Sequence, residues 1–308
     1  MGTNPAGCGW DTNTGTCNDA GPIYHMLPFI EQQPLWSTMS SPITAGGITY
    51  PPGGPWPCWD PYPPYQVRLS GALCPSDGKA WGPHAWNGAI AQVNYAFSRG
   101  DKIENAHVAN KVTAPWGANW VPRGVFQGDG WGNSTGSCTT IAEITDGTSN
   151  TIAISEMAVY TGIPSDVKGG YCIHSGLNIP AVAIPFKGLG GTLNCVGGSV
   201  ASTHWRRGAG WNSGFLMTTG FQTVLPPNAA AAQVDVGEWN WGIWPPQSYH
   251  PGGVNGGFCD GSVRFISDTI NTGNLASAEA GAIGWKNSPY GVWGAMGSIS
   301  GGEPIQSN

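Results

Sequence analysis

Charged side chains are scarce in this sequence. Lysine, arginine, aspartate and glutamate make up 10% of its 308 residues, whereas roughly 25% is usual for a soluble domain. The net charge is -6, so the chain lacks the basic surface that neutralises nucleic-acid phosphates. Nucleic acid is therefore excluded as an expected partner.

Long apolar runs are also missing. The longest candidate, residues 179–186, is interrupted by Pro180 and Pro185, whereas a membrane-spanning helix needs about 18 or more apolar residues. The first residues contain neither the basic nor the apolar region of a secretory signal peptide. We predict no membrane span in this chain.

The cysteines lack the spacings that mark metal or thioredoxin-like redox sites. There is no Cys-x-x-Cys motif among the eight cysteines. An even number in a glycine-rich, charge-poor chain favours disulfides and an oxidising compartment, although eight cysteines allow 105 connectivities. We expect disulfides between cysteines that are neighbours in the sequence. The preferred pairs are Cys8 with Cys17, Cys58 with Cys74, and Cys172 with Cys195, and Cys138 and Cys259 remain as the last two candidates.

The sequence is instead rich in 49 glycines, 26 prolines and 16 tryptophans. Disordered chains are poor in aromatic residues and high in net charge, so this chain folds, with many loops and turns. We expect a flexible N-terminal arm over residues 1–20 and a single domain over residues 21–308. A broken helix is predicted over residues 24–39, where Pro28 and Pro34 suit first-turn positions.

The rest of the chain predicts an α+β fold dominated by antiparallel strands, with long irregular insertions. Residues 51–64 contain seven prolines, which favours an extended surface insertion. Short β-like runs bounded by turn residues follow, and no strand-helix-strand alternation demands a parallel sheet. These runs cover residues 67–69, 93–97, 124–126, 151–157, 170–173 and 223–225.

The strongest local signal is a hairpin around Asp260 and Gly261. This dipeptide predicts a two-residue turn with positive φ at both positions. Pairing outward from it places Phe258 opposite Val263 and Gly256 opposite Phe265. Because side chains alternate along a strand, we expect Phe258, Val263 and Phe265 to face the core.

His250 precedes Asp260-Gly261 by a nine-residue spacer, within SYHPGGVNGGFCDGSVRFI. This stretch resembles the motif of the bacterial prepilin-type His-x(9)-Asp-Gly family. Further blocks similar to that family occur in the same order, namely LPFIEQQPLW, LCPSD, ITDGTSNTI, TGFQTVLPPN and SGGE. Together they span roughly residues 21–305.

The resemblance implies a pilin-like β-rich head and an exported, surface-associated subunit, with no catalytic residue supplied. Members of the family usually begin with a type IV pilin-like leader and a long apolar helix, which this sequence lacks, so we expect its heads to make the subunit contacts. A catalytic dyad of His250 and Asp260 is disfavoured, because an extended segment between them separates the two side chains. We expect His250 to be a structural histidine hydrogen-bonded to backbone, and Asp260 and Gly261 to form the turn.

Calcium is the one cofactor that the sequence suggests. Asp146, Thr148 and Asn150 supply oxygen ligands, together with Glu143 or Asp129. The alternative is a hydrogen-bonded turn before a strand, since EF-hand spacing is absent.

The predicted function is self-assembly into an extracellular fibre, pilus-like appendage or surface layer. A chain with few charges cannot cover its surface with the charge that deters association, and we expect a helical homo-oligomer without enzymatic activity. The alternative is a secreted carbohydrate-binding module. It would use Trp239, Trp241 and Trp244, which we expect on one face of a strand as a glycan platform.

Overall fold

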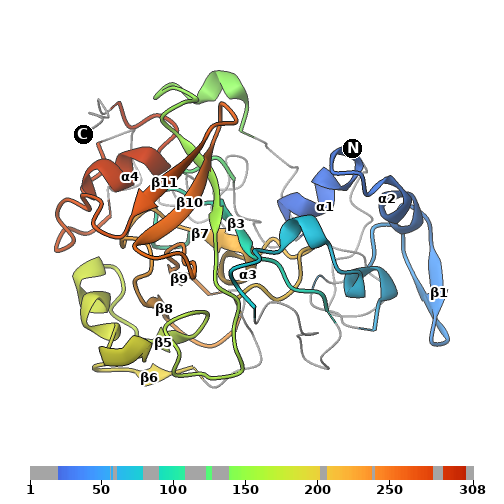
Figure 1. The fold of residues 1–308 in the computed structure, drawn as a ribbon, viewed down its shortest axis with the longest axis horizontal. Helices are drawn as coiled ribbons and strands as arrows, with labels where there is room; N and C mark the ends of the chain where they lie inside the picture. The colour runs from blue at the N-terminus through green and yellow to red at the C-terminus, as the bar shows by residue number, and fades with distance from the viewer. Residues whose placement is uncertain are drawn as a thin grey trace.

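The computed structural model describes residues 20–55, 57, 61–78, 90–107, 123–126, 139–201, 207–237, 240–279 and 287–302. Over these residues it is an α+β structure with short helices and three sheets (Figure 1). The α-helices are α1 (Pro22–Met26), α2 (Gln33–Met39), α3 (Leu216–Thr219) and α4 (Gly291–Gly297). The 3-10 helices are η1 (Leu27–Phe29), η2 (Pro63–Gln66), η3 (Ser70–Ala72), η5 (Ile141–Glu143), η6 (Pro180–Phe186) and η7 (Leu189–Gly191).

The strands are short, and most have two to five residues. They are β1 (Ile43–Ala45), β2 (Ile48–Tyr50), β3 (Tyr95–Ser98), β4 (Ile152–Glu156), β5 (Tyr171–Ile173), β6 (Ser199–Val200), β7 (Gly220–Phe221), β8 (Ala231–Gln233), β9 (Gly242–Ile243), β10 (Gly253–Phe258) and β11 (Val263–Ser267).

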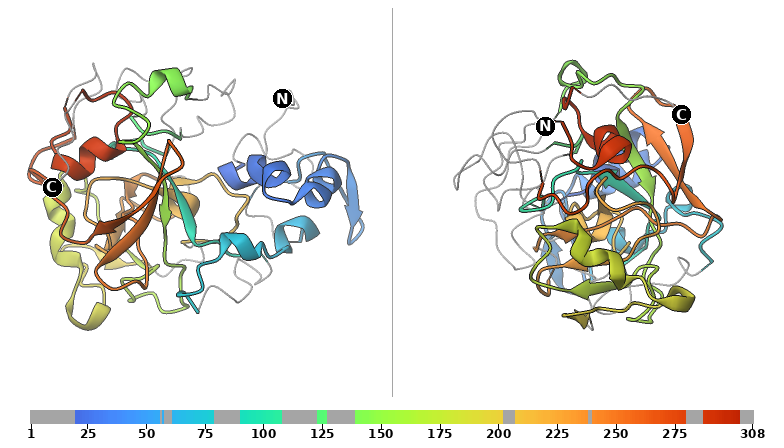
Figure 2. Two further views of the ribbon diagram at one scale, coloured as in Figure 1. Left: turned by 45° about the horizontal axis from the view of Figure 1, so that its top comes forward. Right: turned by 90° about the vertical axis from the view of Figure 1, so that its left-hand side faces the viewer.

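The predicted broken helix is confirmed at the N-terminal end of the described chain. Pro28 lies in the first turn of η1 and Pro34 in the first turn of α2, where a missing backbone N–H costs nothing. These helices and the β1–β2 hairpin lie at one end of the molecule, away from β10 and β11 (Figure 1 and the left view of Figure 2).

The largest sheet has five strands in the order β11-β10-β4-β3-β7. Its first three pairings are antiparallel, as predicted, whereas β3 and β7 run parallel. A four-stranded sheet has the order β6-β5-β8-β9 and also contains one parallel pair, β5 with β8. The predicted dominance of antiparallel pairing is therefore confirmed, and the two parallel pairs join segments far apart in the sequence.

The hairpin between β10 and β11 exists, but its register differs from the predicted one. Gly257 pairs with Val263 and Asn255 with Phe265, because the loop holds three residues rather than two. Only Gly261 has positive φ, at 85°, as in three-residue loops that end in a glycine bulge.

The shifted register moves the expected core residues of β11 to the outer face. Val263 is 71% exposed and Phe265 is 53% exposed, whereas Phe258 and Ile266 are buried. A one-residue slip reverses the face of every side chain in a strand, so the predicted core face was right for Phe258 and wrong for the other two.

The core forms several apolar clusters. The largest joins the N-terminal helices to the five-stranded sheet and contains Tyr50, Tyr62 and Tyr65, whose rings meet edge to face. The predicted surface insertion at 51–64 is therefore wrong at Tyr62 and Pro64, which are buried. Buried tyrosine rings outweigh the extended preference of the prolines.

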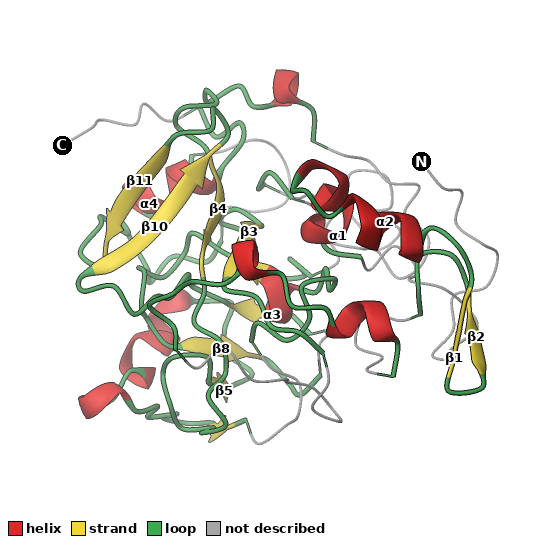
Figure 3. Ribbon diagram, turned by 45° about the vertical axis from the view of Figure 1, so that its right-hand side comes forward, coloured by secondary structure: helices red, strands yellow, loops and turns green. Residues whose placement is uncertain are grey.

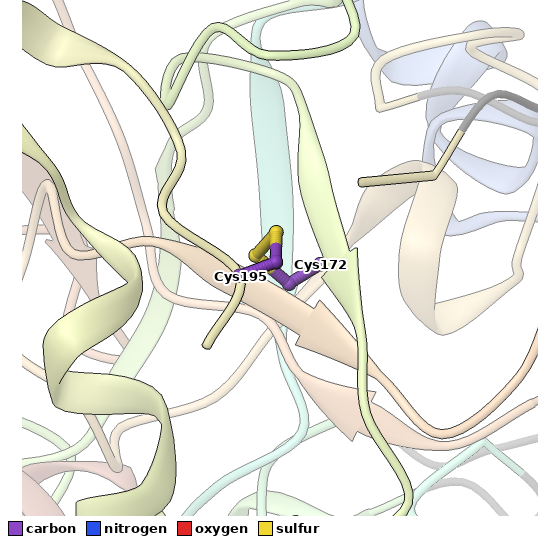
Figure 4. Close-up of a disulfide and its surroundings, with 2 residues drawn as sticks. All are labelled: Cys172 and Cys195. Atoms are coloured by element: carbon purple, nitrogen blue, oxygen red, sulfur yellow. A yellow bond between two sulfur atoms is a disulfide. The ribbon is translucent and has the colours of Figure 1, made fainter. Parts of the chain in front are cut away.

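One expected disulfide is present. Cys172 in β5 is bonded to Cys195 after η7, with their Cα atoms 5.4 Å apart (Figure 4). Cys74 is a free thiol, so the expected bridge to Cys58 is wrong, and Cys259 is also free. Cys8, Cys17, Cys58 and Cys138 lie outside the described residues. Within the described chain, no helix has the length and apolar character to cross a membrane.

Candidate functional site

Three chemically reactive side chains meet beside the centre of the five-stranded sheet. Cys74 follows the short helix η3, Glu156 ends strand β4, and His250 lies in the loop before β10. Cys74 Sγ lies 3.8 Å from Glu156 Oε1 and 3.8 Å from His250 Nε2. Glu156 Oε1 and His250 Nε2 are 2.9 Å apart. We call Cys74, Glu156 and His250 the Cys-Glu-His cluster.

The cluster is largely shielded from water. Cys74 and Glu156 are 6% and 4% exposed, whereas the His250 side chain is 30% exposed. Solvent therefore reaches the cluster from the side of the imidazole. Burial raises the pKa of the nearby Tyr95 phenol, and its electrostatic interactions with Cys74 and Glu156 raise it further.

Glu156 is held in place by the strand beside it. The Asn255 backbone N–H donates to Glu156 Oε2 at 2.7 Å, and Asn255 Nδ2 donates to Oε1 at 3.3 Å. The Glu156 backbone pairs with Tyr95 of β3, so β3 fixes its backbone while β10 holds its carboxylate. Such hydrogen bonds offset the cost of burying a polar carboxyl group.

Cys74 is positioned by a buried polar network that includes Asp77 of the LCPSD block. The Cys74 backbone N–H donates to Asn94 Oδ1 at 2.9 Å, and Asn94 Nδ2 donates to Asp77 Oδ2 at 2.8 Å. Asp77 Oδ2 also accepts from the Val159 backbone N–H at 3.1 Å. The network anchors the turn after η3 to the segment that follows β4.

His250 and Asp260 do not meet. His250 lies before β10 and Asp260 after it, and the six residues of this strand span about 20 Å. His250 bonds Glu156 rather than the expected backbone group, while Asp260 Oδ1 accepts from the Ser262 backbone N–H at 2.9 Å. Asp260 and Gly261 are residues of the turn, as predicted.

The predicted calcium ligands serve as hydrogen-bonding groups of a turn. The Glu143 carboxylate accepts from the Thr140 backbone N–H and hydroxyl at the start of η5. The Asp146 carboxylate accepts from the Gly301 and Gly302 N–H groups, and Asn150 donates to the Asp146 carbonyl.

Thr148 completes this turn, because its carbonyl accepts from the Asp260 N–H. These bonds join the ITDGTSNTI block to the C-terminal segment and to the hairpin tip, which favours the structural alternative over calcium. Asp129 lies outside the described residues.

The expected tryptophan platform does not form. Trp244 is fully buried, with Arg207 over its ring and Tyr171 against it. Trp241 packs against a different apolar cluster from Trp244, and the strand between them, β9, is only two residues long. Trp239 lies outside the described residues. The alternative of glycan binding loses its structural basis at Trp244.

Sequence reasoning missed the Cys-Glu-His cluster. It assigned Cys74 to a disulfide and did not single out Glu156. One signal was available. Cys74 and His250 each lie within a sequence block that carries the family resemblance, and Glu156 is the only charged residue in strand β4, which continues a third such block, ITDGTSNTI. The pairing of β4 with β10 then brings these stretches together.

The fold and site define a β-rich α+β protein with a buried thiol, carboxylate and imidazole at the centre of its main sheet. A family model described as "Protein of unknown function (DUF1559)" matches residues 1–273, and the chain belongs to this family. No curated protein and no solved structure matches the chain.

Proposed function

We propose that this protein is a structural subunit of an extracellular assembly, in which its β-rich heads associate through strand β11. The observation that carries the proposal is the position of this strand at the edge of its sheet. β11 is the outer strand of the five-stranded sheet, and in the described part of the chain it pairs with β10 alone (Figure 3).

The outer strand presents apolar side chains to solvent. Val263 and Phe265 are exposed, while Ile266 packs inward. Arg264 lies over the Phe258 ring, 4.3 Å from its centre, so part of its side chain covers an aromatic face rather than extending from the edge. An edge of this kind accepts a further strand through backbone hydrogen bonds, and apolar side chains add buried area.

Low surface charge supports association. The 12 basic and 18 acidic side chains are few for 308 residues, so contacts between copies desolvate few ions. Other large apolar side chains are also exposed, including Leu189, Phe29 and Ile141. Assembly through such contacts is weakly sensitive to salt.

The symmetry of the contact decides between a closed dimer and a fibre. Pairing of β11 with β11 of a second copy is self-complementary and closes after two subunits. A fibre requires β11 to meet a different surface of the next copy. Residues 1–20 are the proposed donor of that strand, and residues 1–19 lie outside the described part of the chain.

Two further observations support the extracellular, non-catalytic role. The Cys172–Cys195 disulfide is typical of oxidising compartments. The sequence also resembles prepilin-type surface proteins. This resemblance is more specific than the matched family, which is described only as having unknown function. In this role the Cys-Glu-His cluster is a component of the head and turns over no substrate.

Two lysines on β11 test the proposal. The double variant Val263→Lys and Phe265→Lys places two charges on the exposed face of the edge strand, and we expect it to remain monomeric in sedimentation velocity. The matched control, Val196→Lys and Val236→Lys, adds the same charge at exposed positions outside the sheets and should assemble as the wild type does. Equal assembly of both variants would contradict the role of β11.

A further inference from the structure

The Cys-Glu-His cluster has the composition and geometry of a metal centre. We propose that Cys74, Glu156 and His250 bind one Zn²⁺ ion. Among the described residues, these are the histidine, cysteine and acidic side chains whose ligand atoms gather closely enough to share an ion, all within 4.8 Å of one another.

The direction of approach to His250 separates a metal centre from a nucleophilic triad. In a triad the carboxylate bonds one imidazole nitrogen and the nucleophile contacts the other. Here Glu156 Oε1 and Cys74 Sγ both approach Nε2. The carboxylate therefore occupies the nitrogen that a triad needs for the thiol, whereas three ligand atoms facing a common point is the arrangement that a cation requires.

The distances fit tetrahedral coordination by zinc. Zinc bonds of about 2.0 Å to nitrogen and oxygen and 2.3 Å to sulfur place ligand atoms about 3.3 to 3.6 Å apart. The observed separations are 3.8 Å for both sulfur pairs and 2.9 Å for the oxygen–nitrogen pair, so they bracket this range. Shifts of a few tenths of an ångström would bring all three atoms onto one ion.

The donor types select the metal. One thiol, one imidazole and one carboxylate combine sulfur, nitrogen and oxygen, which zinc accepts together. Calcium and magnesium prefer oxygen ligands alone. The cluster supplies a single carboxylate, so the hard cations are disfavoured.

The surrounding hydrogen bonds orient the ligands as an outer shell does in metal sites. Asn255 donates to both oxygens of Glu156. The backbone of Cys74 is fixed by Asn94, and the His250 backbone N–H donates to Ser248 Oγ at 3.1 Å. Each ligand is therefore positioned before an ion arrives.

Three protein ligands leave a fourth tetrahedral position. Since His250 is the partly exposed member of the cluster, this position is within reach of water. The ion would also connect segments 82 and 94 residues apart in the sequence, which links the turn after η3 to β4 and to the loop before β10.

The competing explanation is a buried hydrogen-bonded cluster that needs no metal. Binding measurements distinguish the two. The whole chain, freed of metal with a chelator, is titrated with Zn²⁺ against a chromophoric competitor. We expect one ion per chain, with at least a tenfold loss of affinity in Cys74→Ser and Glu156→Gln. Cys259→Ser removes the other free thiol of the described chain and should retain wild-type affinity.

Cobalt substitution identifies the ligand atom. Co²⁺ bound to the wild-type chain should show a sulfur-to-cobalt charge-transfer band that is absent in Cys74→Ser and present in Cys259→Ser. A wild-type chain that binds no Zn²⁺ would overturn the proposal, as would Cys74→Ser with unchanged affinity, because the ion would then lie elsewhere.

A measurement on the wild-type chain keeps the proposal testable if the variants fail to fold. Zn²⁺ should slow alkylation of Cys74 at least tenfold, while Cys259 on the same molecule reacts at an unchanged rate. Peptide mass mapping assigns each modified cysteine and separates Cys74 from the cysteines outside the described residues. Equal rates at Cys74 with and without Zn²⁺ would refute the site.

Discussion

Replacement of Gly261 measures the backbone strain in the hairpin turn. Gly261 has a φ of 85°, and a β-carbon added there would meet no atom within 4 Å. Any loss of stability in Gly261→Ala is therefore a backbone effect, free of steric contacts. A left-handed conformation costs an L-residue about 1 to 2 kcal/mol, so we expect Gly261→Ala to lose about 1 kcal/mol and Gly261→Val to lose more, because valine is β-branched.

The matched control is Gly71→Ala. A β-carbon at Gly71 also meets nothing within 4 Å, but its φ is not positive, and it lies inside η3. This substitution should be neutral or stabilising by up to about 1 kcal/mol. Gly261→Asn should lose less than Gly261→Ala, since asparagine tolerates the left-handed region better.

Reversible urea unfolding followed by tryptophan fluorescence gives the comparison. The free energies of unfolding of Gly261→Ala and Gly71→Ala should differ by at least about 1 kcal/mol. Equal values for the two variants would refute the strained-turn account. An equal loss from Ser262→Thr would likewise show that Gly261 has no special place in the turn.

The other predictions concern the disulfides, pH and residues 1–20. In the unfolded, unreduced chain, thiol labelling should modify Cys74 and Cys259 and spare Cys172 and Cys195; labelling of the last two would contradict the disulfide. Burial, with a contribution from Arg99, lowers the pKa of His107 to about 4. Because the unfolded chain binds more protons between pH 4 and about 6.5, stability should fall as the pH drops through this window, by up to about 3 kcal/mol. His107→Gln should flatten that dependence, and an unchanged pH profile would refute it. Deletion of residues 1–19 should leave the head folded by circular dichroism and abolish long fibres, whereas unchanged fibres in electron micrographs would remove the arm from the account.

Much of the local structure could be predicted from the sequence. Pro28 and Pro34 marked the starts of helical pieces. The runs at 151–157 and 170–173 contain β4 and β5, and the run at 93–97 overlaps β3. The runs at 67–69, 124–126 and 223–225 are not strands in the structure. Hydrophobic periodicity and amino-acid composition alone do not distinguish a paired strand from an isolated extended segment, since pairing depends on partners far away in the chain.

Register and the site depended on long-range contacts that the sequence does not specify. One extra residue in the turn before Ser262 exposed Val263 and Phe265, which alternation had assigned to the core. Cys74, Glu156 and His250 are brought together only by the pairing of β4 with β10 and by the Asn94 network. A free thiol and a disulfide cysteine look the same in one sequence, so Cys74 was assigned to a bridge that does not form.

Electron microscopy of the purified whole chain tests self-assembly most directly. At high protein concentration and moderate salt, we predict fibres or layers of repeating heads. In a reconstruction of these particles, β11 should lie at the contact between neighbouring copies, with Val263 and Phe265 buried. A homogeneous population of single heads at the same concentration would contradict the structural role.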